Sequence, residues 1–188
     1  MNAFGEHLAE ETGEALSTVP FDVAYTSPLK RARRTAELVL GDRNVPILDE
    51  KRIEEMGFGI YEGLICKEEA SEIPDPEFFQ FFHAPEKYRP KRKGTWRNPF
   101  EEMSCKGRGI FLEELRQDPA RAGQTILIAT HGAALCALLC HMKGADVKDF
   151  WGTGVHKNCA VTIVDVTPEE YRIVEEGKTY YTEEVKPW

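Results

Sequence analysis

Four basic residues occupy five consecutive positions of one short stretch, and they are the clearest sign of chemistry in the chain. They follow an apolar segment, residues 21–25, and the pair Ser27–Pro28. Serine is a favoured N-cap and proline suits the first helical position, so we predict that a helix begins here. Cations at the positive end of a helix are unfavourable by up to about 1 kcal/mol each, and a bound anion would relieve that cost. The four residues are Lys30, Arg31, Arg33 and Arg34.

Arg31 is the strongest candidate of the four. It lies one turn into a helix that follows a buried strand, which is where open α/β sheets place their ligands. A planar guanidinium at that place can hold a phosphate or a carboxylate through two hydrogen bonds. The alternative, most open for Arg33 and Arg34, is a set of solvated side chains on an exposed helix face.

A second turn from strand to helix carries His131 and Gly132. The preceding residues, Ile126 to Ala129, are continuously apolar, as in a strand buried on both faces. Because parallel strands end at the same edge of a sheet, we expect His131 to lie near Arg31. Gly132 lets backbone N–H groups approach a ligand closely. A lone histidine after a buried strand is more often structural, so the functional interpretation depends on the whole group.

Glu55 lies in a segment interrupted by glycines, residues 51–64, which we predict to be a shaped loop. Such loops often carry functional groups, and Glu55 could supply a proton donor, although most glutamates are simply solvated. An arginine, a histidine and a helix N-terminus together suit a phosphoryl group. Transfer of such a group depends chiefly on positioning and on charge stabilisation.

The remaining pattern alternates strands and helices, which indicates an α/β domain with a mostly parallel sheet. The first helix is expected near residues 5–17. Four phenylalanines at positions 78–82 suggest a cap that packs on the main domain, and the basic residues of 88–97 read as an exposed insertion rather than a nucleic-acid site. Further elements are expected as a strand over residues 45–48, a helix over 99–117, a short helix over 146–151 and strands over 159–166 and 171–175.

Length, composition and charge limit the class of protein. With 188 residues, of which 41% are hydrophobic, one globular domain is expected, with an insertion at about residues 65–105. A net charge of -8 argues against a general nucleic-acid partner. No apolar run approaches the roughly 18 residues of a membrane span, so we expect a cytoplasmic protein without a membrane partner. The oligomeric state cannot be inferred.

The cysteines favour reduced thiols over a disulfide framework or a metal site. Their number is odd and their spacing to histidine is not that of a zinc site, so we expect neither a metal nor another cofactor. Cys136 and Cys140 lie four residues apart on an apolar stretch, where they would pack as small hydrophobic side chains. The five are Cys66, Cys105, Cys136, Cys140 and Cys159.

Three motifs in this order, SPLKRARRTAEL, EEMGFGIYEG and ILIATHGAALCALL, resemble those of the histidine phosphatase superfamily, the phosphoglycerate mutase-like group. The resemblance implies a three-layer, doubly wound α/β fold and no metal. It also implies that Arg31 binds the phosphate of a small phosphorylated metabolite, with His131 and Gly132 at the same site. His131 would stabilise the transferring phosphoryl group, and Glu55 would protonate the leaving alcohol.

The family's signature triplet, Arg-His-Gly on the first strand, is absent from the 188 residues. In the family its histidine attacks phosphorus and becomes phosphohistidine. One hypothesis is therefore a phosphomonoester hydrolase whose natural chain carries a further N-terminal segment; mutase action is less favoured. The alternative is a non-catalytic phosphate-binding or interaction protein that retains an anion pocket. A deletion product that folds poorly is a third possibility, since losing a central strand exposes a sheet edge.

Overall fold

Three parallel strands form the central sheet, in the order β2-β1-β3, in a computed structural model that describes residues 1–66, 70–89 and 108–185. The register places Ala24 of β1 opposite Ile47 on one side and Leu127 on the other. A separate antiparallel pair joins β4 to β5. The sheet is therefore mostly parallel, as predicted. The strands are β1 (Val23–Thr26), β2 (Ile47–Asp49), β3 (Ile126–Ala129), β4 (Val161–Val166) and β5 (Tyr171–Lys178).

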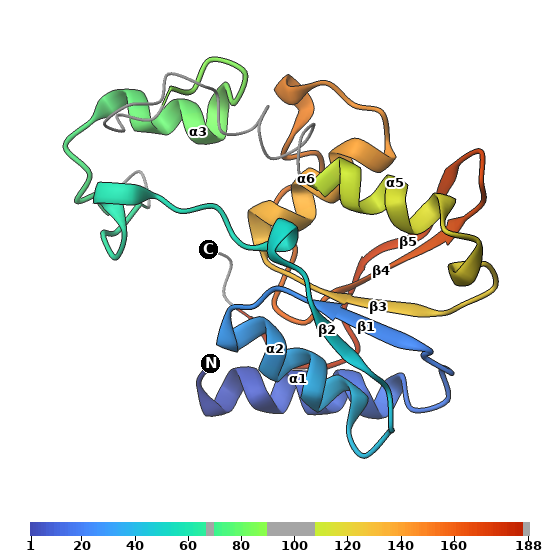
Figure 1. Ribbon diagram of the computed structural model, residues 1–188. Helices are drawn as coiled ribbons and strands as arrows, with labels where there is room; N and C mark the ends of the chain where they lie inside the picture. Colours follow the sequence, from blue (N-terminus) through green and yellow to red (C-terminus); the bar gives the residue numbers. More distant parts are fainter. Residues whose placement is uncertain (67–69, 90–107, 186–188) are drawn as a thin grey trace.

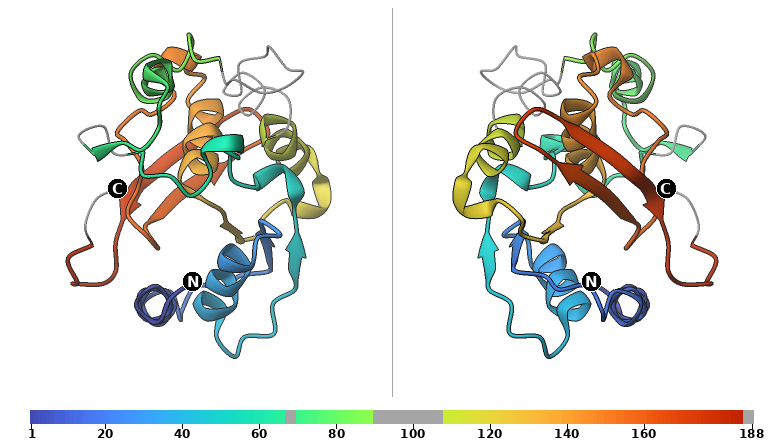
Figure 2. Two further views of the ribbon diagram at one scale, coloured as in Figure 1. Left: turned by 90° about the vertical axis from the view of Figure 1, so that its left-hand side faces the viewer. Right: turned by 90° about the vertical axis from the view of Figure 1, so that its right-hand side faces the viewer.

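Helices cover both faces of the three-stranded sheet, which confirms the predicted three-layer α/β fold. Figures 1 and 2 show α1 and α2 on one side and α5 and α6 on the other. Among the described residues, no helix combines the length and the apolar character needed to cross a membrane. The α-helices are α1 (Ala3–Ala15), α2 (Lys30–Leu40), α3 (Gln80–His83), α5 (Gly109–Gln117) and α6 (Gly132–Met142). The 3-10 helices are η1 (Lys51–Ile53), η2 (Gly59–Tyr61), η4 (Pro76–Phe79), η6 (Pro119–Arg121) and η7 (Val147–Asp149).

The packing of α1 on α2 depends on a glycine. A Cβ atom at Gly13 would lie 2.8 Å from the carbonyl oxygen of Leu38 and 2.9 Å from that of Val39. Real Cβ atoms do not approach backbone so closely, so a larger residue would push the two helices apart. The close contact fixes α2, and with it the first turn of α2, against the rest of the domain.

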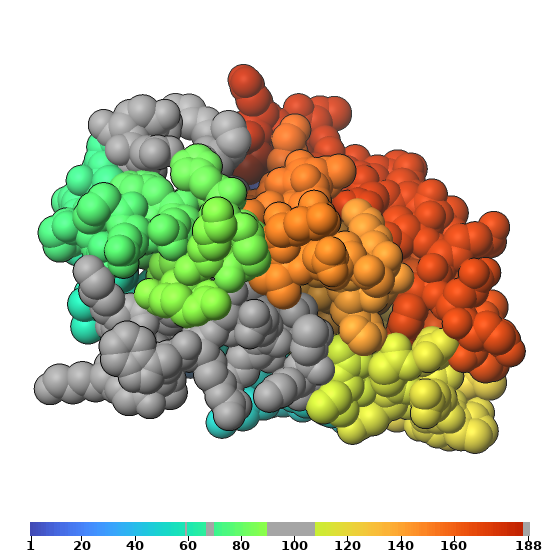
Figure 3. All heavy atoms as spheres, turned by 90° about the horizontal axis from the view of Figure 1, so that it is seen from above, coloured from blue at the N-terminus to red at the C-terminus, as the bar shows by residue number. Residues whose placement is uncertain are grey.

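An aromatic cluster packs against α6, as predicted for the phenylalanines at 78–82. Phe78 and Phe81 are almost fully buried and share a core with Ala133 and Ala137 of α6. The Phe81 ring lies 5.0 Å from that of Trp151, and Figure 3 shows the green residues of this region against orange residues 143–155. The division into one domain with an insertion remains a prediction, because residues 90–107 lie outside the described chain.

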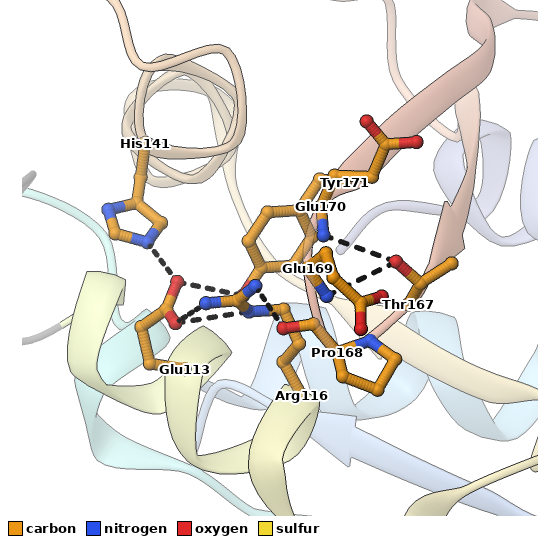
Figure 4. Close-up of polar contacts among 8 residues, drawn as sticks. All are labelled: Glu113, Arg116, His141, Thr167, Pro168, Glu169, Glu170 and Tyr171. Atoms are coloured by element: carbon orange, nitrogen blue, oxygen red, sulfur yellow. Dashed lines mark hydrogen bonds and ion pairs between the residues drawn. The ribbon is translucent and has the colours of Figure 1, made fainter.

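A polar network fixes the β4–β5 hairpin to the helices above the sheet. Glu113 of α5 accepts a hydrogen bond from Tyr171 of β5 at 3.1 Å and pairs with His141 of α6 at 3.0 Å (Figure 4). Arg116 pairs with the same carboxylate and donates to the carbonyl oxygen of Pro168 in the hairpin turn at 2.6 Å. One carboxylate thus joins two helices and the hairpin.

Several predicted boundaries need correction. The first helix begins two residues before the predicted Gly5, because Asn2 caps it through a hydrogen bond from the Gly5 amide. Helix α2 begins at Lys30, and its N-cap position is Leu29. Ser27 was therefore wrongly predicted as the N-cap: its buried hydroxyl accepts a 3.3 Å hydrogen bond from the Leu29 amide, before the helix starts. The first half of the helix predicted over 99–117 and most of the basic segment 88–97 lie outside the described residues.

Candidate active site

The two strand-to-helix turns bring Arg31 and His131 into direct contact. Arg31, in the first turn of α2, donates from Nε to Nδ1 of His131 at 3.0 Å. His131 is the N-cap residue of α6 and follows β3. Because β1 and β3 are adjacent parallel strands, their carboxyl ends deliver both side chains to one edge of the sheet. The juxtaposition expected from the sequence is present, and the roles of both residues remain predictions.

His131 is held in one orientation by partners on both ring nitrogens. While Arg31 donates to Nδ1, Nε2 lies 2.8 Å from the hydroxyl oxygen of Ser27. Burial, reinforced by the charges of Arg31 and Arg108, lowers the pKa of His131 to about 4. The ring is therefore neutral at pH 7. Since Nδ1 accepts, the proton lies on Nε2, which donates to Ser27.

This proton position argues against a serine nucleophile. A histidine that activates a hydroxyl must accept its proton, whereas Nε2 of His131 already carries one. The Ser27 hydroxyl is also fully buried. Ser27 thus acts as a support for the imidazole rather than as an attacking group.

Glu55 occupies the N-terminus of α6. Its carboxylate accepts hydrogen bonds from the amides of Ala133 at 3.3 Å and Ala134 at 3.1 Å. Backbone N–H groups at a helix start favour an anion, so this carboxylate supplies the negative charge that the helix end attracts. Gly132 lies beside it: a Cβ atom there would be 2.8 Å from Val155 and 3.9 Å from Oε2 of Glu55. A side chain at position 132 would crowd this end of the helix.

The loop that carries Glu55 is anchored by its backbone. The amide of Glu50 donates to the carbonyl of Thr26 at the end of β1. Thr130, which precedes His131, donates from its hydroxyl to the Ile53 carbonyl at 2.8 Å, and the Ile53 side chain is fully buried. The carboxyl ends of β1 and β3 therefore position this loop as well as their own side chains.

Arg31 differs from Arg33 and Arg34 in its ion pairs. Arg33 pairs with Asp49 at 2.7 Å, and Arg34 pairs with Glu6 at 2.9 Å. These two arginines are thus surface cations with carboxylate partners, Arg33 partly exposed and Arg34 exposed, in line with the solvated-face interpretation. Arg31 is also exposed, but within the described part of the chain its guanidinium contacts only His131, so the Nη groups are available to an anion.

Arg108 is a site residue that the sequence reasoning missed. It lies immediately before α5, is 6% exposed, and donates from Nη2 to the Glu54 carbonyl. The spacing contained a signal: Arg108 stands three, four and seven residues before the apolar positions Phe111, Leu112 and Leu115. That spacing places it on the buried face of the helix.

A possible metal-ligand group lies elsewhere on the surface. Ligand atoms of His7, Glu11 and Glu183 are within 4.8 Å of one another, and the described residues contain no other group of this kind. His7 is half exposed and already pairs with Glu183 at 2.8 Å and with Glu11 at 3.4 Å. The prediction that the protein needs no metal is not tested by this arrangement.

Residues 1–179 match the model of the histidine phosphatase superfamily (branch 1). The chain is 31% identical over 173 residues to the uncharacterized phosphatase PhoE of Bacillus subtilis, covering 92% of this chain and 79% of that protein. It is 29% identical over 150 residues to phosphoserine phosphatase 1 of Hydrogenobacter thermophilus, covering 80% and 67%. Among solved structures, Bacillus stearothermophilus YhfR superposes with a TM-score of 0.83 at 28% identity, covering 95% of this chain and 85% of that one.

Proposed function

Because the chain belongs to the histidine phosphatase superfamily, we propose that it is a phosphomonoester phosphatase that acts through a phosphohistidine intermediate. The observation that carries the proposal is the state of Arg31. This exposed guanidinium touches a neutral, oriented imidazole at the start of a helix, and no described carboxylate pairs with it. The arrangement suits a phosphoryl group, which needs cationic and N–H donors held in place.

The site residues take the following roles in this proposal. Arg31 binds two phosphoryl oxygens through its Nη groups, because a guanidinium fork matches two oxygens of a phosphate. His131 and the backbone N–H groups beginning at Gly132 stabilise the charge that develops on the transferring group. Glu55 donates a proton to the leaving alcohol. To do so it must first take up a proton, and it must move from the Ala133 and Ala134 amides, because both carboxylate oxygens act as acceptors there.

The nucleophile is the part that the described site does not supply. Among the described histidines, His131 is the one that contacts Arg31; His7 pairs with Glu183, and His141 pairs with Glu113. The phosphatase proposal therefore includes a further N-terminal segment with the Arg-His-Gly triplet of the family. The alternative function, phosphate binding without turnover, is favoured by the same observation if no such segment exists.

The proposal extends to substrate and location. Relatives include a phosphoserine phosphatase, which supports a small phosphorylated metabolite as the substrate class. The described cysteines, Cys66, Cys136, Cys140 and Cys159, are free thiols, which fits a reducing compartment such as the cytoplasm.

Hydrolysis of p-nitrophenyl phosphate by the protein purified from its native source tests the proposal. We expect release of phosphate and an intact mass above the 21.3 kDa of the present chain. Binding of orthophosphate without any hydrolysis, measured as a rise in Tm, would instead support the non-catalytic alternative. A protein that neither hydrolyses the ester nor responds to millimolar orthophosphate would contradict both.

A further inference from the structure

Arg108 is a buried cation that forms no ion pair with a carboxylate among the described residues. Only 6% of the residue is exposed, and Nε is buried without a hydrogen-bond partner among the described residues. Its hydrogen bond in this part of the chain runs to a backbone carbonyl, that of Glu54. Burying a charge without a paired carboxylate is costly, and arginines are rarely fully buried without a partner. A structural role alone would be served more cheaply by an apolar side chain.

The position of Arg108 links it to Glu55. The Glu54 carbonyl that it binds belongs to the residue immediately before Glu55, whose carboxylate lies at the start of α6. Thr130 holds the preceding carbonyl, that of Ile53. Two successive carbonyls are thus held, one from the end of β3 and one from the start of α5, and the next residue carries the functional carboxylate. Loss of either tether would let Glu55 move away from the helix.

The charge of Arg108 also acts on the site. Burial lowers the pKa of Arg108, and the nearby carboxylates of Glu55 and Glu54 oppose that effect. The same guanidinium, together with Arg31, contributes to the low pKa of His131. Arg108 therefore lies within electrostatic range of Glu55 and His131, and it adds a second positive charge to the region that would receive a phosphate.

We infer that Arg108 is a positioning residue of the anion site: it fixes the Glu55 loop through the Glu54 carbonyl and supplies a buried positive charge that favours a bound phosphate. This inference rests on the proposed function, because it assigns Arg108 to the phosphate site of Arg31 and His131. Arg108 does not itself touch the reacting atoms; it acts through Glu55 and through the local potential.

Two substitutions at position 108 and one matched control test the inference. Arg108→Met keeps the length of the stem and removes the charge and the tether, whereas Arg108→Lys keeps the charge and loses the fork. Arg116→Met is the control, because Arg116 lies on α5, the helix that Arg108 precedes, and it also holds a backbone carbonyl, that of Pro168 in the hairpin turn (Figure 4). Each variant of the 188-residue chain is titrated with orthophosphate by calorimetry, and the pKa of its His131 is measured by NMR.

We expect Arg108→Met to weaken orthophosphate binding by about tenfold or more and to raise the pKa of His131 from about 4. Arg108→Lys should restore part of the affinity and most of the low pKa. Arg116→Met should change neither, although it lowers Tm. Unchanged affinity and an unchanged His131 pKa in a folded Arg108→Met protein would overturn the inference, as would equal effects of the control.

The two proposals fail in different ways. If the wild-type chain does not bind orthophosphate, the proposed function loses its basis, and the His131 titration alone decides the role of Arg108. A raised His131 pKa in Arg108→Met, absent in Arg116→Met, then still supports an electrostatic positioning role. If Arg108→Met does not fold, Arg108→Lys takes its place: a changed orthophosphate affinity with a retained low His131 pKa supports the tether, and wild-type affinity overturns it.

Discussion

The starts of helices α2 and α6 lie side by side, but only α6 has a carboxylate of the protein at the positive end of its dipole. At α6, the Glu55 carboxylate accepts from the amides of Ala133 and Ala134. At α2, the N-cap residue Leu29 makes no side-chain hydrogen bond and the first turn holds no acidic residue. That turn instead carries Arg31, whose charge adds to the positive end of the helix.

The difference indicates how the site responds to an anion. The α6 end already has an internal anion, which a phosphate would have to displace or share. The α2 end has an exposed guanidinium that is free to bind. A phosphate held by Arg31 can therefore reach the α6 amides only as Glu55 moves aside.

Of the changes at the two helix starts, removal of Arg31 should have the largest effect on turnover. Arg31→Ala removes the guanidinium that lies beside His131, so we expect turnover by the active protein to fall by about 100- to 1,000-fold and orthophosphate binding to weaken in parallel. Steady-state kinetics with p-nitrophenyl phosphate measure this effect. The control is Arg33→Ala, which removes an arginine of the same helix that pairs with Asp49. Equal losses in the two variants would contradict the role of Arg31.

Neutralising the internal anion should separate binding from chemistry. Glu55→Gln keeps the shape of the side chain and removes the charge that competes with phosphate, so we expect orthophosphate to bind about three- to tenfold more tightly. Turnover should nevertheless fall by about 100-fold, because an amide cannot protonate the leaving alcohol. Calorimetry and kinetics on the same variant give the two values. Weaker binding together with unchanged turnover would show that Glu55 is a structural cap.

The histidine between the two helix starts should titrate unusually low. We expect NMR to give His131 a pKa of about 4, whereas the pKa of His7, hydrogen-bonded to Glu183, should lie above its usual value. The unfolded chain binds a proton at His131 near pH 6.5 and the folded chain does not, so stability is lost as pH falls from about 6.5 toward 4. A His131 pKa near 6.5 would mean that burial and the two arginines do not act on it.

The smallest effect is expected from removing the hydroxyl of Ser27, which contacts the His131 ring. Ser27→Ala leaves the Nε2–H group without its acceptor at 2.8 Å, which should cost about 1–3 kcal/mol of the free energy of unfolding. Urea denaturation measures the loss, and ¹⁵N shifts of the ring report whether the Nε2–H tautomer persists. Ser17→Ala, at an exposed position, is the control. A loss no larger than that of the control would show that Ser27 does not hold the imidazole.

Local signals made much of this arrangement predictable. The apolar run of β3 was predicted with the bounds that the structure has, Ile126–Ala129. Its predicted burial on both faces was wrong for the first three residues, which are only partly buried, whereas Ala129 is buried. The contact between Arg31 and His131 followed from topology, since adjacent parallel strands end at the same edge. Both inferences needed only the sequence near each turn and the expectation of a parallel sheet.

The parts that the sequence did not predict depend on partners far along the chain. Ser27 is of a residue type that often caps helices, but α2 begins later, at Lys30. Its hydroxyl instead contacts the imidazole of His131, which lies 104 residues along the chain. Arg108 binds a carbonyl 54 residues before it, so its tether could not be inferred from its neighbours. The sequence predicts Glu55 as a proton donor but not its position at the start of α6, because the amides that it binds, those of Ala133 and Ala134, lie far along the chain.

An NMR titration of the 188-residue chain with orthophosphate tests the central claim most directly, namely that the two helix starts form one anion site. We expect saturable shifts of the Ala133 and Ala134 amides and of the His131 ring, with His141 and its network unaffected. These signals should share one Kd, because one ligand contacts both helix ends. Shifts confined to other regions, or no saturable shift at the starts of α2 and α6, would contradict the account.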